Sequence, residues 1–280
     1  MNKQESISKK LDNVEVKEFG NRSVVVKITD FCNNQCKHCC FSCGPKNKLF
    51  MELSMAQKIN SFFSNTTDHN WWFNMMGGEP TLHPDYEKII DSFEGRNIRL
   101  VTNGWWINNL KATERFVTYL KNSKATLRIG VSRDHYHPPK VGLLAYTHLM
   151  DLGFKDDFGL STPDPEQEDK SIAMVGRAWW NEIGDPMLNH FQAYCESSNT
   201  RDTSFTVLED GTVTYCPFGI YPIGSVVKNN LEELKDMRCK IKTAMHNNCA
   251  TCHSCYRNWD MGYRSKCIKK GYDIYNKTSL

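Results

Sequence analysis

The chain of 280 residues carries a formal net charge of +3, and 40% of its residues are hydrophobic. This length allows one large domain with a smaller one beside it. The sequence contains no basic stripe, no acidic tail and no apolar run of about 20 residues, so nothing in it indicates a nucleic-acid partner or a membrane-spanning helix. The polar N-terminus lacks the apolar core of a secretory signal, and we therefore expect a cytoplasmic protein.

The region from about residue 23 to 178 alternates strand-like and helix-like segments. Such alternation implies parallel strands joined by crossover helices, and six strands suit a partial (β/α)6 TIM-type barrel, an α/β fold. We expect strands over 23–29, 71–76, 98–102, 125–132, 157–162 and 172–178, and helices over 54–63, 85–95, 112–121 and 140–152.

Unusual local sequences follow these strands, always at the same end. Five cysteines follow the first strand, Gly77-Gly78-Glu79-Pro80 follows the second, and Thr102-Asn103-Gly104 ends the third. Ser132 and Asp134 follow the fourth, and Gly176-Arg177 closes the last. Chemistry in barrels of this type sits at the C-terminal ends of the strands, so the sequence predicts a site there.

The first cysteines have the spacing Cys32-x3-Cys36-x2-Cys39, which places three thiolates in one loop. Disulfides are rare in the cytosol, so cysteines this close together indicate a metal site. A structural zinc site and an ordinary four-iron cluster each use four ligands, and three thiolates therefore leave one iron open to bind something else. Zinc or a chance spacing is the alternative interpretation.

Together with Gly77-Gly78-Glu79-Pro80, this spacing resembles the radical S-adenosylmethionine superfamily. The resemblance implies a 4Fe–4S cluster on Cys32, Cys36 and Cys39, with the methionyl amino and carboxylate groups of S-adenosylmethionine on the open iron. The reduced cluster would then give an electron to the sulfonium. The products would be methionine and a 5′-deoxyadenosyl radical, which abstracts a hydrogen atom from a substrate.

The resemblance also assigns contacts to S-adenosylmethionine. The segment Gly77–Pro80 would hold the methionyl amino group, and His38 would pack near the adenine. The remaining contacts would be with the ribose or the methionyl carboxylate, from Asn103, Ser132, Asp134 and Arg177. A guanidinium suits such a carboxylate because it can donate two parallel hydrogen bonds. For each residue, the alternative is a polar group that satisfies backbone atoms at a strand end.

Two further features near this site have plainer interpretations. Cys40 and Cys43 are extra thiols that we expect to be packed, since free cysteine behaves as a small hydrophobe. Asp134-His135-Tyr136-His137 is expected to form a strand-end loop and not a metal site, because no further ligand spacing accompanies it.

After about residue 185 the pattern changes. Segments 205–208 and 213–215 flank Glu209-Asp210-Gly211, which predicts a β-hairpin. The rest of this region is rich in cysteine and irregular. We therefore divide the chain into an N-terminal segment (1–22), a barrel (23–185) and a small cysteine-rich C-terminal domain (186–280).

The spacing Cys195-x15-Gly211-x4-Cys216 is similar to the opening of SPASM and twitch extensions, which bind auxiliary four-iron clusters. The full extension continues with C-x2-C-x5-C-x3-C, whereas this chain continues with C-x2-C-x2-C. The resemblance thus implies one auxiliary 4Fe–4S cluster, with two clusters or a structural zinc knuckle as alternatives. Four ligands would come from Cys195, Cys216, Cys249, Cys252 and Cys255. The roles of Cys239 and Cys267 are left open.

The family resemblance does not specify the class of substrate. We favour a ribosomally made peptide, with dehydrogenation of a small molecule such as an aminocyclitol or sugar as the alternative. Only some 22 residues precede the first strand, too few for a winged-helix leader-binding domain, so a separate leader-recognition protein is one expected partner. A flavodoxin or ferredoxin would supply electrons. The rival class is a non-catalytic iron–sulfur or zinc-binding protein, which would not need an open iron.

Overall fold

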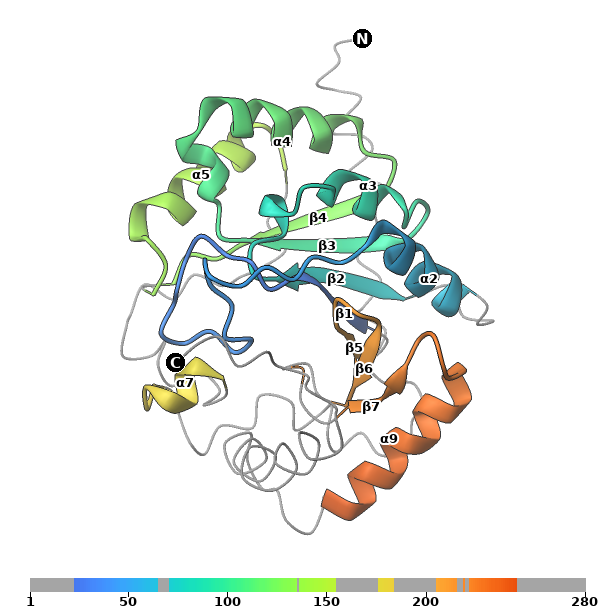
Figure 1. The fold of residues 1–280 in the computed structure, drawn as a ribbon. Coiled ribbons are helices and arrows are strands. Elements are labelled where there is room, and N and C mark those ends of the chain that lie inside the picture. The colour runs from blue at the N-terminus through green and yellow to red at the C-terminus, as the bar shows by residue number, and fades with distance from the viewer. Residues whose placement is uncertain are drawn as a thin grey trace.

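The computed structural model describes residues 23–64, 71–134, 136–154, 176–183, 205–215, 219 and 222–245 (Figure 1). Its strands are β1 (Ser23–Thr29), β2 (Trp72–Gly77), β3 (Asn97–Thr102), β4 (Thr126–Val131), β5 (Phe205–Val207), β6 (Thr212–Thr214) and β7 (Pro222–Ser225). Its α-helices are α2 (Leu53–Ser64), α3 (Tyr86–Asp91), α4 (Leu110–Asn122), α5 (Pro139–Asp151), α7 (Arg177–Trp180) and α9 (Leu231–Met245). Two short 3-10 helices are η1 (Pro80–Leu82) and η2 (Trp105–Asn108).

The described strands form one sheet in the order β4-β3-β2-β1-β5-β6-β7. Strands β1 to β4 pair in parallel, and β5 pairs in parallel with the other side of β1. The β5–β6 and β6–β7 pairs are antiparallel. The predicted α/β class, with parallel strands, crossover helices and a C-terminal hairpin, is confirmed, and the barrel is open.

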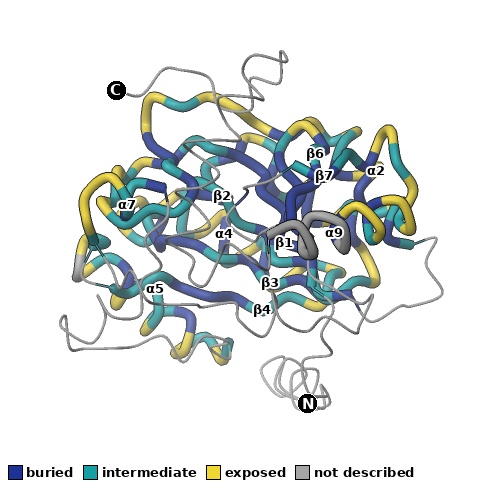
Figure 2. Tube along the Cα trace, turned by 90° about the horizontal axis from the view of Figure 1, so that it is seen from below, coloured by how far each residue is buried: buried dark blue, intermediate teal, exposed yellow. Residues whose placement is uncertain are grey.

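Helices α2 to α5 cover one face of the parallel strands (Figure 1). The β1 side chains on that face are Val24, Val26 and Ile28, all fully buried, and β2 adds Phe73 and Met75. Burying one such side chain stabilises the fold by roughly 1.5–3 kcal/mol. Figure 2 shows the buried residues running along the strands, so the helices and this face of the sheet form the core that holds the strand ends in place.

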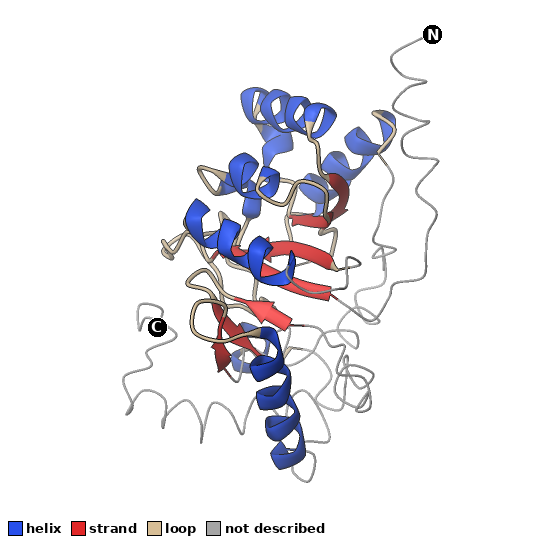
Figure 3. Cartoon of the chain, turned by 90° about the vertical axis from the view of Figure 1, so that its right-hand side faces the viewer, coloured by secondary structure: helices blue, strands red, loops and turns tan. Residues whose placement is uncertain are grey.

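The hairpin of β5 and β6 extends the sheet beyond β1, at the end opposite β4 (Figures 1 and 3). Gly211 in its turn has φ of +82°, a conformation that glycine adopts without steric cost. Long-range pairing with β1 places this hairpin against the barrel strands. The third strand of this part, β7, was not predicted from the sequence.

Several element boundaries differ from the predictions. Helix α2, expected over 54–63, spans Leu53–Ser64, and the Glu52 carbonyl accepts hydrogen bonds from the Met55 and Ala56 amides. Residues 177–178, expected to end a strand, lie in α7. The strand expected at 157–162 and the start of that at 172–178 lie outside the described residues. Among the described helices, none has the length and apolar character needed to cross a lipid bilayer.

Candidate functional site

The loop that follows β1 carries the first five cysteines and lies at the edge where the parallel strands end (Figure 1). Backbone hydrogen bonds close its base. The Cys32 amide donates to the Gly44 carbonyl across 3.2 Å, and the Gly44 amide donates to the Asp30 carbonyl across 3.3 Å. The loop is therefore a closed structure that begins and ends at β1.

Cys32, Cys36 and Cys39 are all free thiols. Burial, with smaller contributions from the nearby charges of Glu79, Cys39 and Cys36, raises the pKa of Cys32 to about 12. The Cys39 amide donates to the Cys36 carbonyl across 3.2 Å, which makes a tight turn between these two cysteines. The three predicted metal ligands therefore lie on one loop, and the raised pKa of Cys32 means that its thiol ionises at neutral pH only where a cation stabilises the thiolate.

Cys40 and Cys43 are the two further thiols of the same loop. Cys43 is buried and packs against Phe41 and Val25, and Cys40 packs beside them. The Cys43 thiol donates a hydrogen bond to Cys39, and this bond, together with the cation of Arg177, lowers the pKa of Cys39. Both extra thiols are packed as expected, and Cys43 additionally stabilises the thiolate of one predicted ligand.

Gly77 and Gly78 dock onto the end of β1. The Gly78 amide donates to the Thr29 carbonyl across 2.7 Å, and the Glu79 amide donates to the Phe31 carbonyl across 2.8 Å. A Cβ at Gly78 would overlap the Phe31 carbonyl oxygen, and one at Gly77, where φ is +144°, would overlap that of Thr29. The family resemblance implies that this segment holds the methionyl amino group of S-adenosylmethionine. In the structure their close neighbour is the root of the cysteine loop.

Glu79 joins the ends of β2 and β3. Its fully buried carboxylate accepts hydrogen bonds from the Asn103 amide at 2.7 Å, the Thr102 hydroxyl at 2.7 Å and the Thr81 amide at 3.2 Å. Burial raises its pKa, although these hydrogen bonds favour the charged form. Glu79 therefore fixes the position of Asn103.

Asn103 reaches back to the cysteine loop. Its side-chain nitrogen donates to Asn33 Oδ1 across 2.9 Å and lies 3.6 Å from Cys32 Sγ. Its side-chain oxygen accepts from the Trp105 amide across 3.0 Å. The predicted contact with the ribose or carboxylate remains a prediction, while the contact with Cys32 was not foreseen.

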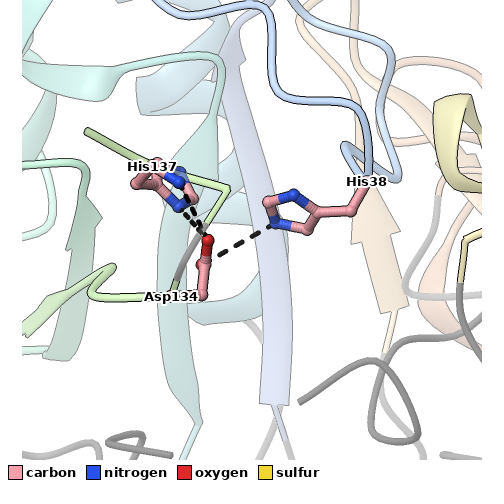
Figure 4. A group of neighbouring side chains, drawn as sticks. All are labelled: His38, Asp134 and His137. Carbon is pink, nitrogen blue, oxygen red and sulfur yellow. Dashed lines mark hydrogen bonds and ion pairs between the residues drawn. The ribbon is translucent and has the colours of Figure 1, made fainter. Parts of the chain in front are cut away.

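His38, Asp134 and His137 form a cluster between the cysteine loop and the end of β4 (Figure 4). His137 Nδ1 lies 2.6 Å from Asp134 Oδ1, and His38 Nε2 lies 3.7 Å from Asp134 Oδ2. The His38 ring also packs against Tyr136, with centroids 4.6 Å apart. The three residues could hold a metal ion by distance, but hydrogen bonds and ion pairs already account for their arrangement.

Asp134 and His137 each stabilise the charged form of the other. Burial lowers the pKa of His137, but hydrogen bonds to Asp134 and Cys36 outweigh it and raise that pKa to about 10. For Asp134, the His137 hydrogen bond and charge outweigh burial and lower the pKa. Asp134 therefore links the end of β4 to the cysteine loop, and His137, which the sequence analysis placed in an ordinary loop, contacts Cys36.

Arg177 holds the cysteine loop from the other side. Its Nε donates to the Cys36 carbonyl across 2.8 Å, its Nη2 to the Cys43 carbonyl across 2.5 Å, and its amide to the Cys39 carbonyl across 3.0 Å. Gly176 precedes it with φ of +59°, and a Cβ there would overlap the Cys40 carbonyl oxygen. The predicted contact with a methionyl carboxylate remains a prediction, and the observed role is to clamp the loop.

The remaining predicted residues are less informative. Ser132 donates its backbone amide to the Thr102 carbonyl across 2.8 Å, which continues the pairing of β3 and β4 to the site. The predicted auxiliary ligands lie outside the described residues: Cys195, Cys216, Cys249, Cys252 and Cys255.

No protein-family model matches the chain. In sequence, the chain is 27% identical over 214 residues to the putative peptide biosynthesis protein YydG of Bacillus subtilis, and the match covers 70% of this chain and 64% of that relative. The chain thus spans less than two thirds of the relative's length.

Two groups of solved structures share the fold. BtrN, in complex with AdoMet and 2-DOIA, matches with a TM-score of 0.52 and 14% identity, over 87% of this chain and 89% of that one. SuiB of Streptococcus suis, bound to the precursor peptide SuiA, matches with a TM-score of 0.55 and 14% identity, over 99% and 78%. At this identity the matches establish the fold, and they agree with the open partial barrel.

Proposed function

We propose that this chain is a radical S-adenosylmethionine enzyme that cleaves its cosubstrate reductively and uses the 5′-deoxyadenosyl radical to abstract a hydrogen atom from a peptide. The observation that carries the proposal is the joint geometry of two motifs. The loop with Cys32, Cys36 and Cys39 lies at the strand ends, and Gly77–Glu79 is hydrogen-bonded directly to its root.

The chain resembles radical S-adenosylmethionine enzymes in these motifs and in its fold. A peptide substrate is supported by the similarity to YydG, named for peptide biosynthesis, and by the shared fold with SuiB, solved with its precursor peptide. Oxidation of a small molecule is the second candidate, because BtrN, solved with 2-DOIA, shares the fold to a similar degree.

The donor set fits an open iron–sulfur cluster. Cys32, Cys36 and Cys39 would hold a 4Fe–4S cluster, which when bound with S-adenosylmethionine supplies the electron that starts the radical reaction. Arg177 keeps the cysteine loop in place by donating hydrogen bonds to three carbonyl groups of the loop. The positive charge of Arg177 also favours the thiolate form of Cys39. Asn103 places a hydrogen-bond donor beside Cys32 Sγ, a contact of the kind that tunes cluster potentials.

The proposal also includes an auxiliary cluster whose ligands lie outside the residues that the structure describes. We propose one auxiliary 4Fe–4S cluster, held by four of Cys195, Cys216, Cys249, Cys252 and Cys255 in a domain spanning 186–280. Electrons would come from a flavodoxin or ferredoxin, and a separate protein would present the peptide leader. A reducing cytoplasm suits these thiol ligands.

The test is anaerobic reconstitution with iron and sulfide, followed by addition of dithionite and S-adenosylmethionine. The proposal predicts 5′-deoxyadenosine from the wild-type protein and none from a triple alanine variant of Cys32, Cys36 and Cys39. If the wild-type protein forms none, the proposal fails. The iron content of the triple variant separates the cluster counts, since about four irons remain with one auxiliary cluster and about eight with two.

A further inference from the structure

The cysteine loop, drawn in blue after β1 in Figure 1, also carries three lysines. Lys37 lies between two predicted cluster ligands, and Lys46 and Lys48 follow the last cysteine of the loop. All three side chains are exposed, and within the part of the chain that the structure describes none of them forms an ion pair or a hydrogen bond. We call these three residues the lysine surface. Exposed cations that have no counter-charge attract negatively charged partners.

Arg177 brings the two lysine-bearing segments together. Its guanidinium donates to the Cys36 carbonyl across 2.8 Å and to the Cys43 carbonyl across 2.5 Å. Lys37 follows directly after the first of these carbonyls, and Lys46 comes three residues after the second. Because one guanidinium spans only a few ångströms, the two segments lie close together, and their lysines belong to one part of the loop.

Further hydrogen bonds fix the backbone at the lysines. The Lys37 carbonyl accepts from Asn181 Nδ2 across 3.0 Å, which ties this residue to the end of α7. Asn47, which lies between the other two lysines, donates from its side chain to the Ser42 carbonyl across 3.4 Å. The positive charges are therefore carried at defined positions of a closed loop.

Two apolar side chains continue the exposed surface after Lys48. Leu49 is 45% exposed and Phe50 is 36% exposed. The Phe50 ring is held in place by ring contacts with Phe31 and His83, whose centroids lie 5.9 Å and 5.3 Å away. Apolar side chains beside charged ones are the usual composition of a protein–protein interface.

Acidic residues lie at the borders of the loop and not within it. Residues 31–51 contain no aspartate or glutamate. Asp30, at one end, accepts the Leu49 amide on its Oδ1 across 2.7 Å, and Glu52, at the other end, precedes helix α2. Glu182, which follows the contact of α7 with the loop, is an exposed acid of the neighbouring segment. The middle of the loop thus presents positive charge alone.

We propose that the lysine surface docks an acidic protein that carries one electron and delivers it to the cluster site. This inference rests on the proposed function, because it names the surface through which the electron donor reaches the same site. One electron passes from the reduced carrier, which is oxidised, to the bound cluster, which is reduced, and no covalent bond or proton has to move. Electron transfer slows steeply with distance, and the lysine surface belongs to the very loop that carries the three predicted ligands.

The expected complex is short-lived and depends on charge. Complexes between electron-transfer proteins bury less than about 1,200 Å² and are weak, and complementary charges steer their association. An acidic precursor peptide would also be attracted by lysines. The position of Lys37 between two predicted ligands favours the electron carrier, because a substrate needs access to the radical and not to the outer side of the ligand loop.

The test measures binding of the reconstituted enzyme to an oxidised flavodoxin of strongly negative net charge, by anaerobic calorimetry. We expect binding at an ionic strength of about 0.01 M that weakens at least tenfold at about 0.15 M, where the Debye length falls from about 30 Å to about 8 Å. Absence of binding at the lower ionic strength, or binding that ignores salt, overturns the proposal.

A triple variant locates the surface. Replacing all three residues of the lysine surface by glutamine should weaken flavodoxin binding about tenfold. The matched control makes the same change in charge at three exposed lysines of helices α2 and α4, through Lys58→Gln, Lys111→Gln and Lys121→Gln, and should bind like the wild type. Equal binding by the two triple variants contradicts the proposal. So does a lysine-surface variant that keeps flavodoxin binding and instead loses affinity for a glutamate-rich peptide.

The rate of cluster reduction gives a second readout. Bleaching of the cluster absorbance is followed after mixing with reduced flavodoxin, and that rate is divided by the rate with photoreduced deazaflavin, a small uncharged reductant. Any change in the site itself cancels in this ratio. We expect the ratio to fall about tenfold in the lysine-surface variant and to stay unchanged in the control. An unchanged ratio in both variants overturns the proposal.

Failure of this inference is distinguishable from failure of the proposed function. Formation of 5′-deoxyadenosine by the wild-type protein with dithionite needs no protein partner. If the wild type forms none, the enzyme proposal fails, while the binding comparison still tests the lysine surface. If the wild type forms 5′-deoxyadenosine and the two triple variants bind flavodoxin equally, only the docking inference fails.

Discussion

Arg177 Nε donates a hydrogen bond of 2.8 Å to the backbone carbonyl of Cys36, a residue 141 positions earlier in the chain. Its Nη2 and its amide hold two more carbonyls of the same loop. One residue beyond the first four strands thus fixes the loop that presents the predicted cluster ligands. Loss of these hydrogen bonds should therefore destabilise the cysteine loop and leave the stability of the sheet largely unchanged.

Replacing Arg177 by glutamine should weaken cluster retention. The variant loses two charge-assisted hydrogen bonds, each worth about 1.5–3 kcal/mol, while the core is untouched. We expect a several-fold faster loss of visible cluster absorbance under chelator challenge, with little change in melting temperature. Asn181→Ala removes one hydrogen bond to the loop, at the Lys37 carbonyl, and one to the Arg177 carbonyl, and it is the milder control because both bonds come from a neutral amide. Unchanged cluster retention with weakened S-adenosylmethionine binding would instead favour the carboxylate contact predicted from sequence.

Gly78→Ala should disrupt the docking of the second motif onto the cysteine loop. The new Cβ would overlap the Phe31 carbonyl, so the backbone must move. We expect a loss of about 2–4 kcal/mol in the free energy of unfolding, measured with urea. Gly95→Ala is the matched control, because a Cβ there meets nothing within 4 Å and costs only about 1–2 kcal/mol for its positive φ. Equal effects of the two substitutions would show that close packing at Gly78 is unimportant.

Glu79→Gln should destabilise the site because the carboxylate accepts four hydrogen bonds from its neighbours. A glutamine side chain has only one oxygen to accept these hydrogen bonds. Its NH2 group would replace the other oxygen and would face a neighbour that is itself a donor. We expect a loss of about 2–3 kcal/mol in unfolding free energy. Glu94→Gln, at an exposed ion pair on the surface, should stay within about 0.5 kcal/mol. A Glu79→Gln variant as stable as the wild type would contradict the bonding described for this residue.

Lys27 and Glu209 should behave as a coupled pair. Both side chains are buried, and the pair joins β1 to the turn of the hairpin. Lys27→Met alone leaves a buried carboxylate without its cation and should cost about 3–5 kcal/mol. The double variant Lys27→Met with Glu209→Gln should recover part of that loss in a double-mutant cycle of urea unfolding. Additive effects would mean that the two residues do not interact.

Local features of the fold could be predicted from the sequence. The β-branched run in β1, the segments of β2 to β4 and the turn at Glu209–Gly211 each carry their signal within a few residues. Because the ends of parallel strands meet at one edge, the positions of the cysteine loop, Gly77–Pro80 and Asn103 followed from strand order alone.

Long-range relationships could not be predicted in this way. The pairing of β5 with β1 joins segments that are about 180 residues apart, and no local pattern specifies it. The same holds for Arg177, whose partners are carbonyl groups that every residue possesses, and for the contact of His137 with Cys36. The glycines at 77 and 78 were noticed, but the atoms that require them belong to the end of β1 and the root of the cysteine loop.

The most direct test of the enzyme proposal is the yield of 5′-deoxyadenosine from the reconstituted, dithionite-reduced protein with S-adenosylmethionine, compared with two single-cysteine variants. Cys36→Ala removes a predicted cluster ligand, and Cys40→Ala removes a packed thiol of the same loop. The account predicts product from the wild type and from Cys40→Ala, and none from Cys36→Ala. No product from the wild-type protein, or equal product from Cys36→Ala, would contradict it.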